Sequence, residues 1–317
     1  MKKLIGLALF LFVLYALLLM SDPGARSTYN HLNLGQRIGI NGIISLGAGV
    51  LIITGGIDLS IGSVIGLCAT VTAVLLVDYG WHPVLAIPAV LALGAAIGLL
   101  NGLLVTKLRV QAFVVTLCGL FIYRGAARWI AGDKVKGLGK DFVTLKAWLA
   151  GNSEYLLLPR SLLIFLILAA VTTVFLHMSV YGRYLFAVGS NDQAARYSGI
   201  AVDRYRMLAY VICSTLAALF SILYLMEHNS VQPSETGSFF ELYAIAGAVL
   251  GGCSLRGGEG SVLGIMIGTA ILWILPNFTK MWGVPSELEY TVIGTALLIG
   301  ALLDETLRRR DISRADR

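Results

Sequence analysis

The sequence has few charged residues and few cysteines, and both shortages narrow the possible classes of protein. Only 13% of the 317 residues are Asp, Glu, Lys or Arg, about half the share in a soluble domain. This scarcity excludes a soluble globular protein. The four cysteines, Cys68, Cys118, Cys213 and Cys253, show no CxxC spacing, and the four histidines are scattered. No metal site is indicated, and we expect the cysteines to be small buried residues.

Motifs of enzyme chemistry are also missing. The sequence contains no GxxxxGK[ST] phosphate-binding loop and no nucleophile motif. We therefore expect no catalytic residue and no cofactor bound by this chain. Ionisable residues inside apolar segments are limited to Asp58, Glu241 and Arg124. An ion-coupled transporter usually lines its path with several such groups, so the energy for any transport is expected to come from elsewhere.

What the sequence has in abundance is hydrophobic residues, which make up 57% of the chain and gather in long runs. One helical crossing of a bilayer takes about 20 apolar residues. The runs therefore predict an all-α, polytopic membrane protein rather than a β-barrel. We predict about ten transmembrane helices, with a range of eight to ten, in the segments 4–20, 38–54, 61–78, 84–106, 111–127, 161–178, 207–226, 241–255, 260–278 and 288–303.

The basic residues predict the orientation of these helices. More Lys and Arg residues fall on the side that holds both termini, which places both termini in the cytoplasm. The net charge of +6 then reflects topology rather than nucleic-acid binding. Residues 1–317 form one predicted transmembrane domain, with 1–20 as an uncleaved first helix. Its predicted external loop is 128–160, its cytoplasmic loop 179–206 and its cytoplasmic tail 305–317.

The segment Thr54-Gly-Gly-Ile-Asp-Leu-Ser-Ile-Gly-Ser63 joins two apolar runs with almost no polar spacer. Gly55 and Gly56 break the first helix because they lack a Cβ atom. Asp58 or Ser60 can cap the next helix by accepting hydrogen bonds from its first N–H groups. Non-helical backbone inside a membrane is tolerated only against protein or water. The segment is therefore either a tight helical hairpin with a simple cap or part of a substrate pathway.

Residues 55–63, GGIDLSIGS, resemble a hallmark of the permease subunits of ribose-type ABC importers, whose superfamily includes branched-chain amino acid permeases. The resemblance continues through Asn101-Gly102, through 111–125, through GRYLFAVGSN and AARYSGI in the segment 182–200, and through 241–260. It covers residues 35–305. Two positions depart from the family pattern: Gln111 replaces a usual Pro, and Tyr243 replaces a usual Asp.

The resemblance implies roles for two groups of residues. The loop 182–200 is expected to dock on a separate ABC ATPase rather than to be only a basic cytoplasmic loop, with Asn191 as the N-cap of a short helix. The expected ATPase contacts are Gly182, Arg183, Asn191, Ala195, Arg196, Ser198 and Gly199. Glu241, near the outer face, is either a helix-start acid favoured by the macrodipole or part of the substrate entrance. The expected pathway residues are Gly55, Gly56, Asp58, Ser60, Asn101 and Glu241.

The function that the resemblance implies is transport without bond chemistry. A permease of the bacterial inner membrane would receive a monosaccharide from a periplasmic or extracellular binding protein. It would pair with a second permease subunit, and separate ATPase subunits would use ATP. Alternatives are the same kind of permease for a nucleoside, an autoinducer sugar or a branched-chain amino acid, an ion-coupled secondary transporter, and a membrane scaffold or receptor. The Trp and Tyr residues near the ends of the apolar segments are interpreted as membrane anchors.

Overall fold

Helices form almost all of the computed structural model, which describes residues 2–153, 158–288, 290–295 and 298. The long helices are α1 (Lys2–Ser21), α2 (Thr28–Ile53), α3 (Ile61–Ala73), α4 (Pro83–Thr106), α5 (Ala112–Ala131), α7 (Arg160–Thr173), α10 (Val202–His228) and α12 (Val262–Met281). The shorter ones are α6 (Val143–Ala150), α8 (Val180–Ser190), α9 (Asp192–Tyr197) and α11 (Phe240–Leu250). Turns of π-helix extend α3 through Val74–Asp78 and α7 through Val174–Met178, and 3₁₀ turns occupy Pro23–Arg26 and Ser286–Leu288.

Eight helices in the described part of the chain are long and apolar enough to cross a membrane. They correspond to eight of the ten predicted segments. The predicted segment 241–255 is the eleven-residue helix α11, which is shorter than the other eight. The segment 288–303 lies partly outside the described residues, and the tail 305–317 lies wholly outside them. The chain is a polytopic helical membrane protein, as the sequence predicts.

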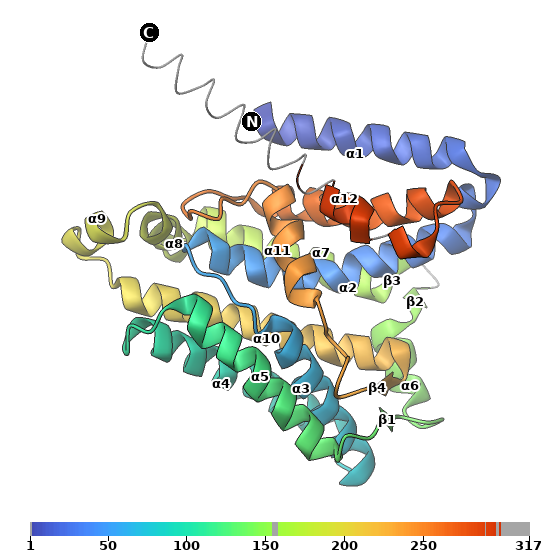
Figure 1. The fold of residues 1–317 in the computed structure, drawn as a ribbon, viewed down its shortest axis with the longest axis horizontal. Helices are drawn as coiled ribbons and strands as arrows, with labels where there is room; N and C mark the ends of the chain where they lie inside the picture. Colours follow the sequence, from blue (N-terminus) through green and yellow to red (C-terminus); the bar gives the residue numbers. More distant parts are fainter. Residues whose placement is uncertain (1, 154–157, 289, 296–297, 299–317) are drawn as a thin grey trace.

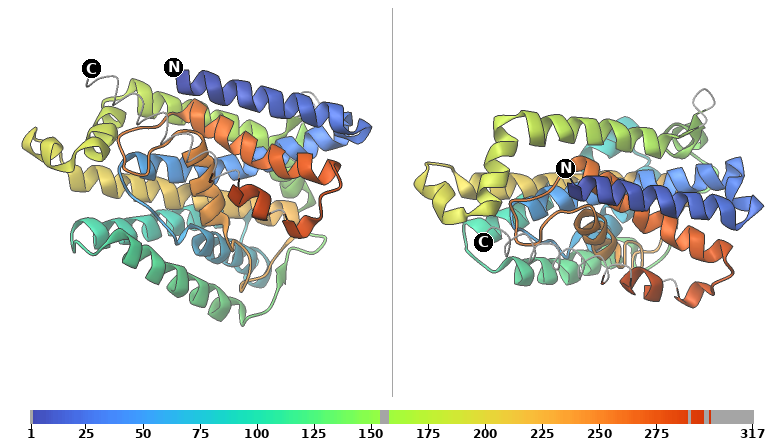
Figure 2. Two further views of the ribbon diagram at one scale, coloured as in Figure 1. Left: turned by 45° about the horizontal axis from the view of Figure 1, so that its top comes forward. Right: turned by 90° about the horizontal axis from the view of Figure 1, so that it is seen from above.

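The bundle has two distinct ends (Figure 1). One end carries the short helices α8 and α9 and is called the α9 end below. The opposite end, called the ribbon end, carries α6 and two small antiparallel sheets, in which β1 (Lys136–Gly137) pairs with β4 (Ser230–Val231) and β2 (Asn152–Ser153) with β3 (Leu158–Pro159). The predicted loop 128–160 thus contains a short helix and strands in its described part. Helix α1 lies on the outside of the bundle against α12 (Figure 2).

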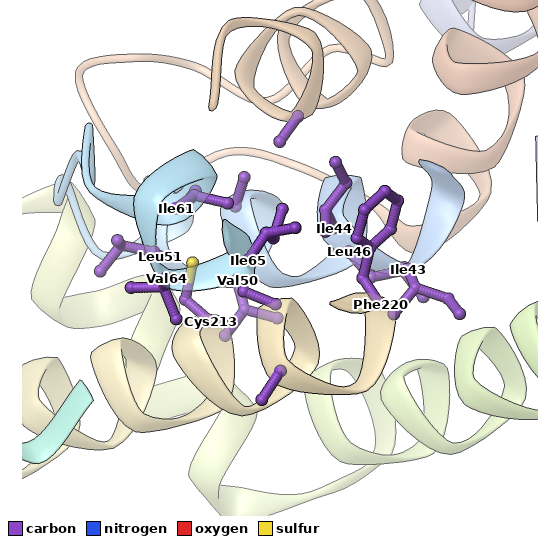
Figure 3. Close-up of a cluster of buried hydrophobic side chains, with 14 of the residues drawn as sticks. Ile43, Ile44, Leu46, Val50, Leu51, Ile61, Val64, Ile65, Cys213 and Phe220 are labelled. Carbon is purple, nitrogen blue, oxygen red and sulfur yellow. The ribbon is translucent and has the colours of Figure 1, made fainter. Parts of the chain in front are cut away.

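Helix α10 is the centre of the bundle and packs extensively on α4 and α2. Lipid tails are as apolar as leucine, so helices in a membrane associate through close packing rather than through burial from water. Gly94, Gly98 and Gly102 form a stripe on α4 whose absent Cβ atoms leave room for the backbone of α10. Buried side chains of α2, α3 and α10, among them Ile44, fill the space between these three helices (Figure 3).

The four cysteines are free, but they are not all buried as predicted. Cys68, Cys213 and Cys253 are buried, whereas Cys118 is exposed on α5. The prediction was wrong for Cys118 because lipid can cover an apolar helix face that no protein segment covers. An apolar sequence environment therefore does not identify protein-buried positions in a membrane protein.

Two helices begin inside the bundle after a stretch of non-helical backbone (Figure 1). Helix α2 ends at Ile53, and residues 54–60 return without helical structure to the start of α3, where Ser60 and Ile61 are almost fully buried. In the second case the chain leaves β4 at the ribbon end, and residues 232–239 lead inward to α11. Non-helical backbone at this depth must be satisfied by protein groups. The contacts that satisfy it form the candidate site.

Candidate substrate pathway and coupling loop

Asp58 organises the segment 54–60. Its side chain is 1% exposed. Its Oδ1 atom accepts hydrogen bonds from the backbone N–H of Ser60 at 2.7 Å and from the Ser60 hydroxyl at 2.6 Å. Its Oδ2 atom is buried and has no hydrogen-bond partner among the described residues. Burying an unpaired carboxylate oxygen is costly, and the amide of Asn101 is close enough to interact with this carboxyl group.

The network continues from Ser60 to helices α4 and α5. The Asn101 Nδ2 atom donates to the Ser60 hydroxyl at 3.2 Å, and the Tyr123 hydroxyl donates to Asn101 Oδ1 at 2.7 Å. On another side, the Tyr210 hydroxyl of α10 donates to the Ile57 carbonyl at 3.3 Å. Three helices therefore fix the non-helical segment through side-chain hydrogen bonds, which a buried polar network requires.

The predicted capping of α3 is only partly right. Ser60 occupies the N-cap position, but its side chain accepts no hydrogen bond from the helix. Its hydroxyl donates to Asp58 instead, and Asp58 binds the N–H group of Ser60 rather than one within α3. After the short Gly-Gly turn, the Asp58 carboxylate stands two residues before Ser60, the N-cap of α3. Gly55 adopts a φ of +76°, which a residue with a Cβ atom rarely adopts.

The two internal helix starts meet at a crossing of glycines. A Cβ atom on Gly62 of α3 would overlap the Gly237 carbonyl and a Glu241 carboxylate oxygen, and a Cβ atom on Gly237 would overlap the Gly62 carbonyl. Gly237 also has a φ of +84°. Glu241, in the first turn of α11, is 9% exposed. It therefore lies inside the bundle at the start of α3, and its position near the outer face of the membrane stays a prediction.

Arg124 of α5 holds the segment 232–239 from the inside. Its Nη1 atom donates to the carbonyls of Pro233, at 3.1 Å, and Thr236, at 2.5 Å. A Cβ atom on Gly66 would lie 2.7 Å from both Arg124 Nη1 and the Thr236 carbonyl. The guanidinium fits here because it is planar and donates several hydrogen bonds at once. Its charge also acts on the carboxylate of Glu241, which neighbours the same crossing.

At the α9 end, α8 and α9 form a compact helical element. Asn191 is the N-cap of α9, as predicted, and accepts a hydrogen bond from the Ala194 N–H at 3.0 Å. Ser179 caps α8 in the same way. Ala195 and Gly182 are buried within the element, and their contact with an ATPase stays a prediction. The side chains of Arg183 and Ser198 are exposed, and Gly199 ends α9 with a φ of +80°.

Arg196 is engaged inside this element. It donates to Asp192 at 2.8 Å and to Asp203 at 2.6 Å. Arg206 also contacts Asp192 at 3.2 Å, and Lys107 lies 3.7 Å from Asp203. The hydrogen bonds to Asp203 and Asp192 raise the pKa of the Arg196 guanidinium. These exposed pairs contribute little stability singly, but together they fix the orientation of α9 relative to α10.

The base of the α8–α9 element touches the end of α2. A Cβ atom on Gly189 would overlap the Ile53 carbonyl, and the Gly258 N–H donates to the same carbonyl at 2.9 Å. Gly257 and Gly258 have positive φ values and lie against Gly189 and Ser190. Ile53 is the last residue of α2 before the segment that contains Asp58. A displacement of α8 would therefore act directly on the backbone that leads to the buried carboxylate.

The structure thus brings Asp58, Ser60 and Asn101 into one network and places Glu241 beside the start of α3. Gly55 and Gly56 lie nearer to the contact between α8 and the end of α2 than to this network. Sequence reasoning missed Tyr123 and Tyr210 as members of the network. Tyr197, which the sequence analysis interpreted as a membrane anchor, is 91% exposed on α9. Tyr123 and Arg124 lie in the stretch 111–125, which resembles a family motif. A polar side chain inside an apolar run is the sequence signal that could have identified them.

The chain matches, over residues 30–302, the family described as "Branched-chain amino acid transport system / permease component". It belongs to this family. It is 36% identical to the ribose import permease protein of Escherichia coli over 93% of this chain and 91% of that protein. The Bacillus subtilis ribose import permease protein is also 36% identical, over 96% of this chain and 93% of the relative.

A third relative is the autoinducer 2 import system permease protein of an Enterobacter species. It is 38% identical over 84% of this chain and 76% of that protein. No solved structure matches the chain. The predicted family is confirmed, and its members are transport permeases.

The two departures from the family pattern have simple structural settings. Gln111 is the N-cap residue of α5 and has a φ of −57°, close to the value that a proline would impose, but its side chain makes no cap hydrogen bond. Tyr243 stacks on Trp273 with ring centroids 5.5 Å apart. It borders a largely apolar hollow of about 320 Å³. The phenol therefore occupies an aromatic environment where a carboxylate would be poorly solvated.

Proposed function

We propose that this permease imports a monosaccharide as the membrane-spanning subunit of an ABC importer in the bacterial inner membrane. In this proposal the α9 end is cytoplasmic and the ribbon end is external. A binding protein delivers the sugar at the ribbon end, a second permease subunit completes the path, and separate ATPase subunits use ATP. This chain binds no cofactor and performs no bond chemistry. The ribose permeases that share 36% of its residues support this assignment.

The observation that carries the proposal is the link between the α8–α9 element and the broken helix. The element has a rigid interior, with Ala195 buried and Arg196 paired, and it presents Tyr197 outward. Its base contacts the Ile53 carbonyl, which precedes the Asp58 network. A partner that moves α9 would therefore move the segment 54–60. A large exposed aromatic residue at the tip is suited to anchoring a protein partner.

ATP-dependent uptake in proteoliposomes tests the proposal. The permease is purified with its co-expressed ATPase and mixed with its binding protein, and radiolabelled D-ribose, D-xylose and D-galactose are supplied. We expect ATP-dependent accumulation of at least one sugar and its loss in Tyr197→Ala, together with loss of the co-purified ATPase. Tyr79→Ala is the matched control, because Tyr79 is 70% exposed but follows α3 on the way to α4 at the other end. Sugar uptake without ATP would overturn the proposal.

The alternative cargo with support of its own is an autoinducer sugar, because the autoinducer 2 permease is also similar to this chain. The same proteoliposomes distinguish it. Uptake of autoinducer 2, with no uptake of the three monosaccharides, would reassign the cargo while leaving the importer mechanism in place.

A further inference from the structure

A polar hollow opens at the ribbon end, between the end of α10, β4, the segment 232–239 and the start of α11. Its volume is about 430 Å³, within the range of about 300–1,000 Å³ that is common for small-molecule sites. It is separate from the buried Asp58 network, but the segment that forms its wall also forms the glycine crossing through Gly237. An occupant of the hollow would therefore touch one side of a segment whose other side touches α3.

One wall of the hollow is aromatic. Tyr224 and His228 stack with ring centroids 3.9 Å apart and an interplanar angle of 16°. Phe240 packs edge-on against Tyr224 at 5.9 Å. The face of an aromatic ring is electronegative and attracts positively polarised edges. The C–H groups on one face of a sugar ring have this polarity. Because His228 and Phe220 both stack on Tyr224, the exposed ring of His228 is the part of this wall that a sugar ring can cover.

Much of the remaining lining is polar. Ser230, Gln232, Glu235 and Ser238 line the hollow, and all four residues are exposed. An amide, a carboxylate and two hydroxyls supply both donors and acceptors, as a ligand with several hydroxyl groups requires. The lining residues include no Lys or Arg. The hollow therefore lacks the cation that would pair with the carboxylate of an amino acid or with a phosphate.

The polar wall is held in place before any ligand arrives. The Gln232 N–H donates to the Thr236 hydroxyl at 3.0 Å, which closes the segment into a turn. Arg124 fixes the carbonyls of Pro233 and Thr236 from the interior. A preorganised wall loses less conformational entropy on binding. The Gln232 and Glu235 side chains take part in none of these hydrogen bonds, and both residues are exposed and line the hollow.

We propose that this hollow is the external loading site of the permease, where a neutral monosaccharide released by the binding protein packs against the exposed ring of His228 and is held by Gln232 and Glu235. The proposal rests on the function proposed above. It adds a site in the permease that selects polyhydroxylated, uncharged ligands. The sugar leaves the binding protein for this hollow before the interior opens.

Cysteine protection measures occupancy directly. Ser238→Cys is introduced into a Cys118→Ser background of the full complex in proteoliposomes, and a membrane-impermeant charged maleimide is added outside. The probe is whichever of D-ribose, D-xylose and D-galactose the wild-type complex takes up. We expect this sugar to slow labelling of Ser238→Cys, whereas L-valine does not. Lys134→Cys, in the loop before β1, is the control and should label at the same rate with or without sugar.

Uptake supplies the second readout. Gln232→Ala and Glu235→Gln should each raise the concentration of loaded binding protein needed for half-maximal uptake by about tenfold, as expected for a lost hydrogen bond to a polar ligand. Unchanged uptake in both variants, together with no protection of Ser238→Cys, would overturn the loading site. If the wild-type complex still took up the sugar, this result would not affect the proposed importer function. A wild-type complex that takes up none of the three sugars overturns the monosaccharide function and the loading site with it.

Discussion

Two stretches of non-helical backbone enter the bundle, and they are held in different ways. Residues 54–60 are fixed by a network that spreads over Asp58, Ser60, Asn101 and Tyr123, with Tyr210 binding from another side. Residues 232–239 depend on the guanidinium of Arg124, which binds two of their carbonyls. The first arrangement divides the stabilisation among several modest interactions. In the second, local hydrogen bonds close the turn, and Arg124 is the one described side chain outside the segment that hydrogen-bonds to it.

This difference suggests different mechanical roles. A segment held by many hydrogen bonds to three helices moves only when those helices move, and its neighbour Ile53 contacts the α8 base. A segment that is hydrogen-bonded from outside by one described side chain can be loosened from the bundle by displacing that side chain. In the proposed importer, the first segment would respond to the ATPase and the second to events at the ribbon end.

The largest effect is expected at the crossing that joins the two segments. Gly237→Ala would place a Cβ atom against the Gly62 carbonyl and would impose a positive φ on alanine. We expect a loss of about 3 kcal/mol or more in the free energy of unfolding, seen as a much lower melting temperature in detergent and little folded protein. Gly125→Ala is the control, because nothing lies within 4 Å of a Cβ atom there. An alanine tolerated equally at both positions would refute the tight crossing.

The next largest effect should follow from removal of the cation. Arg124→Met leaves the Pro233 and Thr236 carbonyls without this donor and the nearby Glu241 without this positive charge. Breaking a buried charged interaction on one side costs about 3 kcal/mol, and part of this loss is expected because Arg124 is only partly buried. The melting temperature in detergent is the readout.

Arg128→Met is the matched control for this prediction. Arg128 lies one helical turn further along α5 and pairs with Asp133 at the surface. Its removal should change the melting temperature little. Equal losses in the two variants would contradict the special role of Arg124 and would point to a general effect of positive charge on α5.

A smaller effect is expected in the distributed network. Tyr123→Phe removes one hydrogen bond to Asn101 and should cost about 1 kcal/mol. Tyr29→Phe, at a side chain that is 78% exposed, should cost nothing measurable. If Tyr123→Phe lowered the melting temperature as much as Arg124→Met, then the two segments would not differ in how their stabilisation is distributed.

The sequence predicted the first segment better than the second, for a physical reason. Gly55 and Gly56 interrupt an apolar run, and Asp58 follows them, so a break inside the membrane could be inferred directly. Residues 232–239 are polar and lie between apolar runs, as an ordinary surface loop does. Only the contacts with Arg124 and Gly62, which are distant in sequence, draw them inward.

One partner within the α8–α9 element was also beyond the sequence, although the Asp192–Arg196 pair has the i,i+4 spacing of a local helix pattern. The basic character of the loop and the Asn191 cap could be predicted from local patterns. From the sequence we expected Arg196 to contact the ATPase. In the fold it donates a hydrogen bond to Asp203, at the start of α10. The direction of a long charged side chain depends on tertiary contacts, and one-dimensional patterns do not contain them.

The smallest effect on the melting temperature is expected at Asp133, just beyond the end of α5. It compares an exposed ion pair, Arg128–Asp133, with the partly buried Arg124. The hydrogen bond from Arg128 holds the pKa of the Asp133 carboxyl below its usual value. A depressed folded-state pKa contributes stability above the unfolded-state pKa of about 3.9, and this contribution is lost as the pH falls through the folded-state pKa. The melting-temperature difference between wild type and Asp133→Asn should therefore be small at pH 7 and should vanish once the pH has fallen below the folded-state pKa. Because the pair is exposed, 0.5 M salt should also abolish the difference, whereas the loss in Arg124→Met should persist in the same salt. A difference for Asp133→Asn that survived salt would show that the end of α5 is shielded from solvent, and the contrast between Arg124 and Arg128 would then no longer rest on burial.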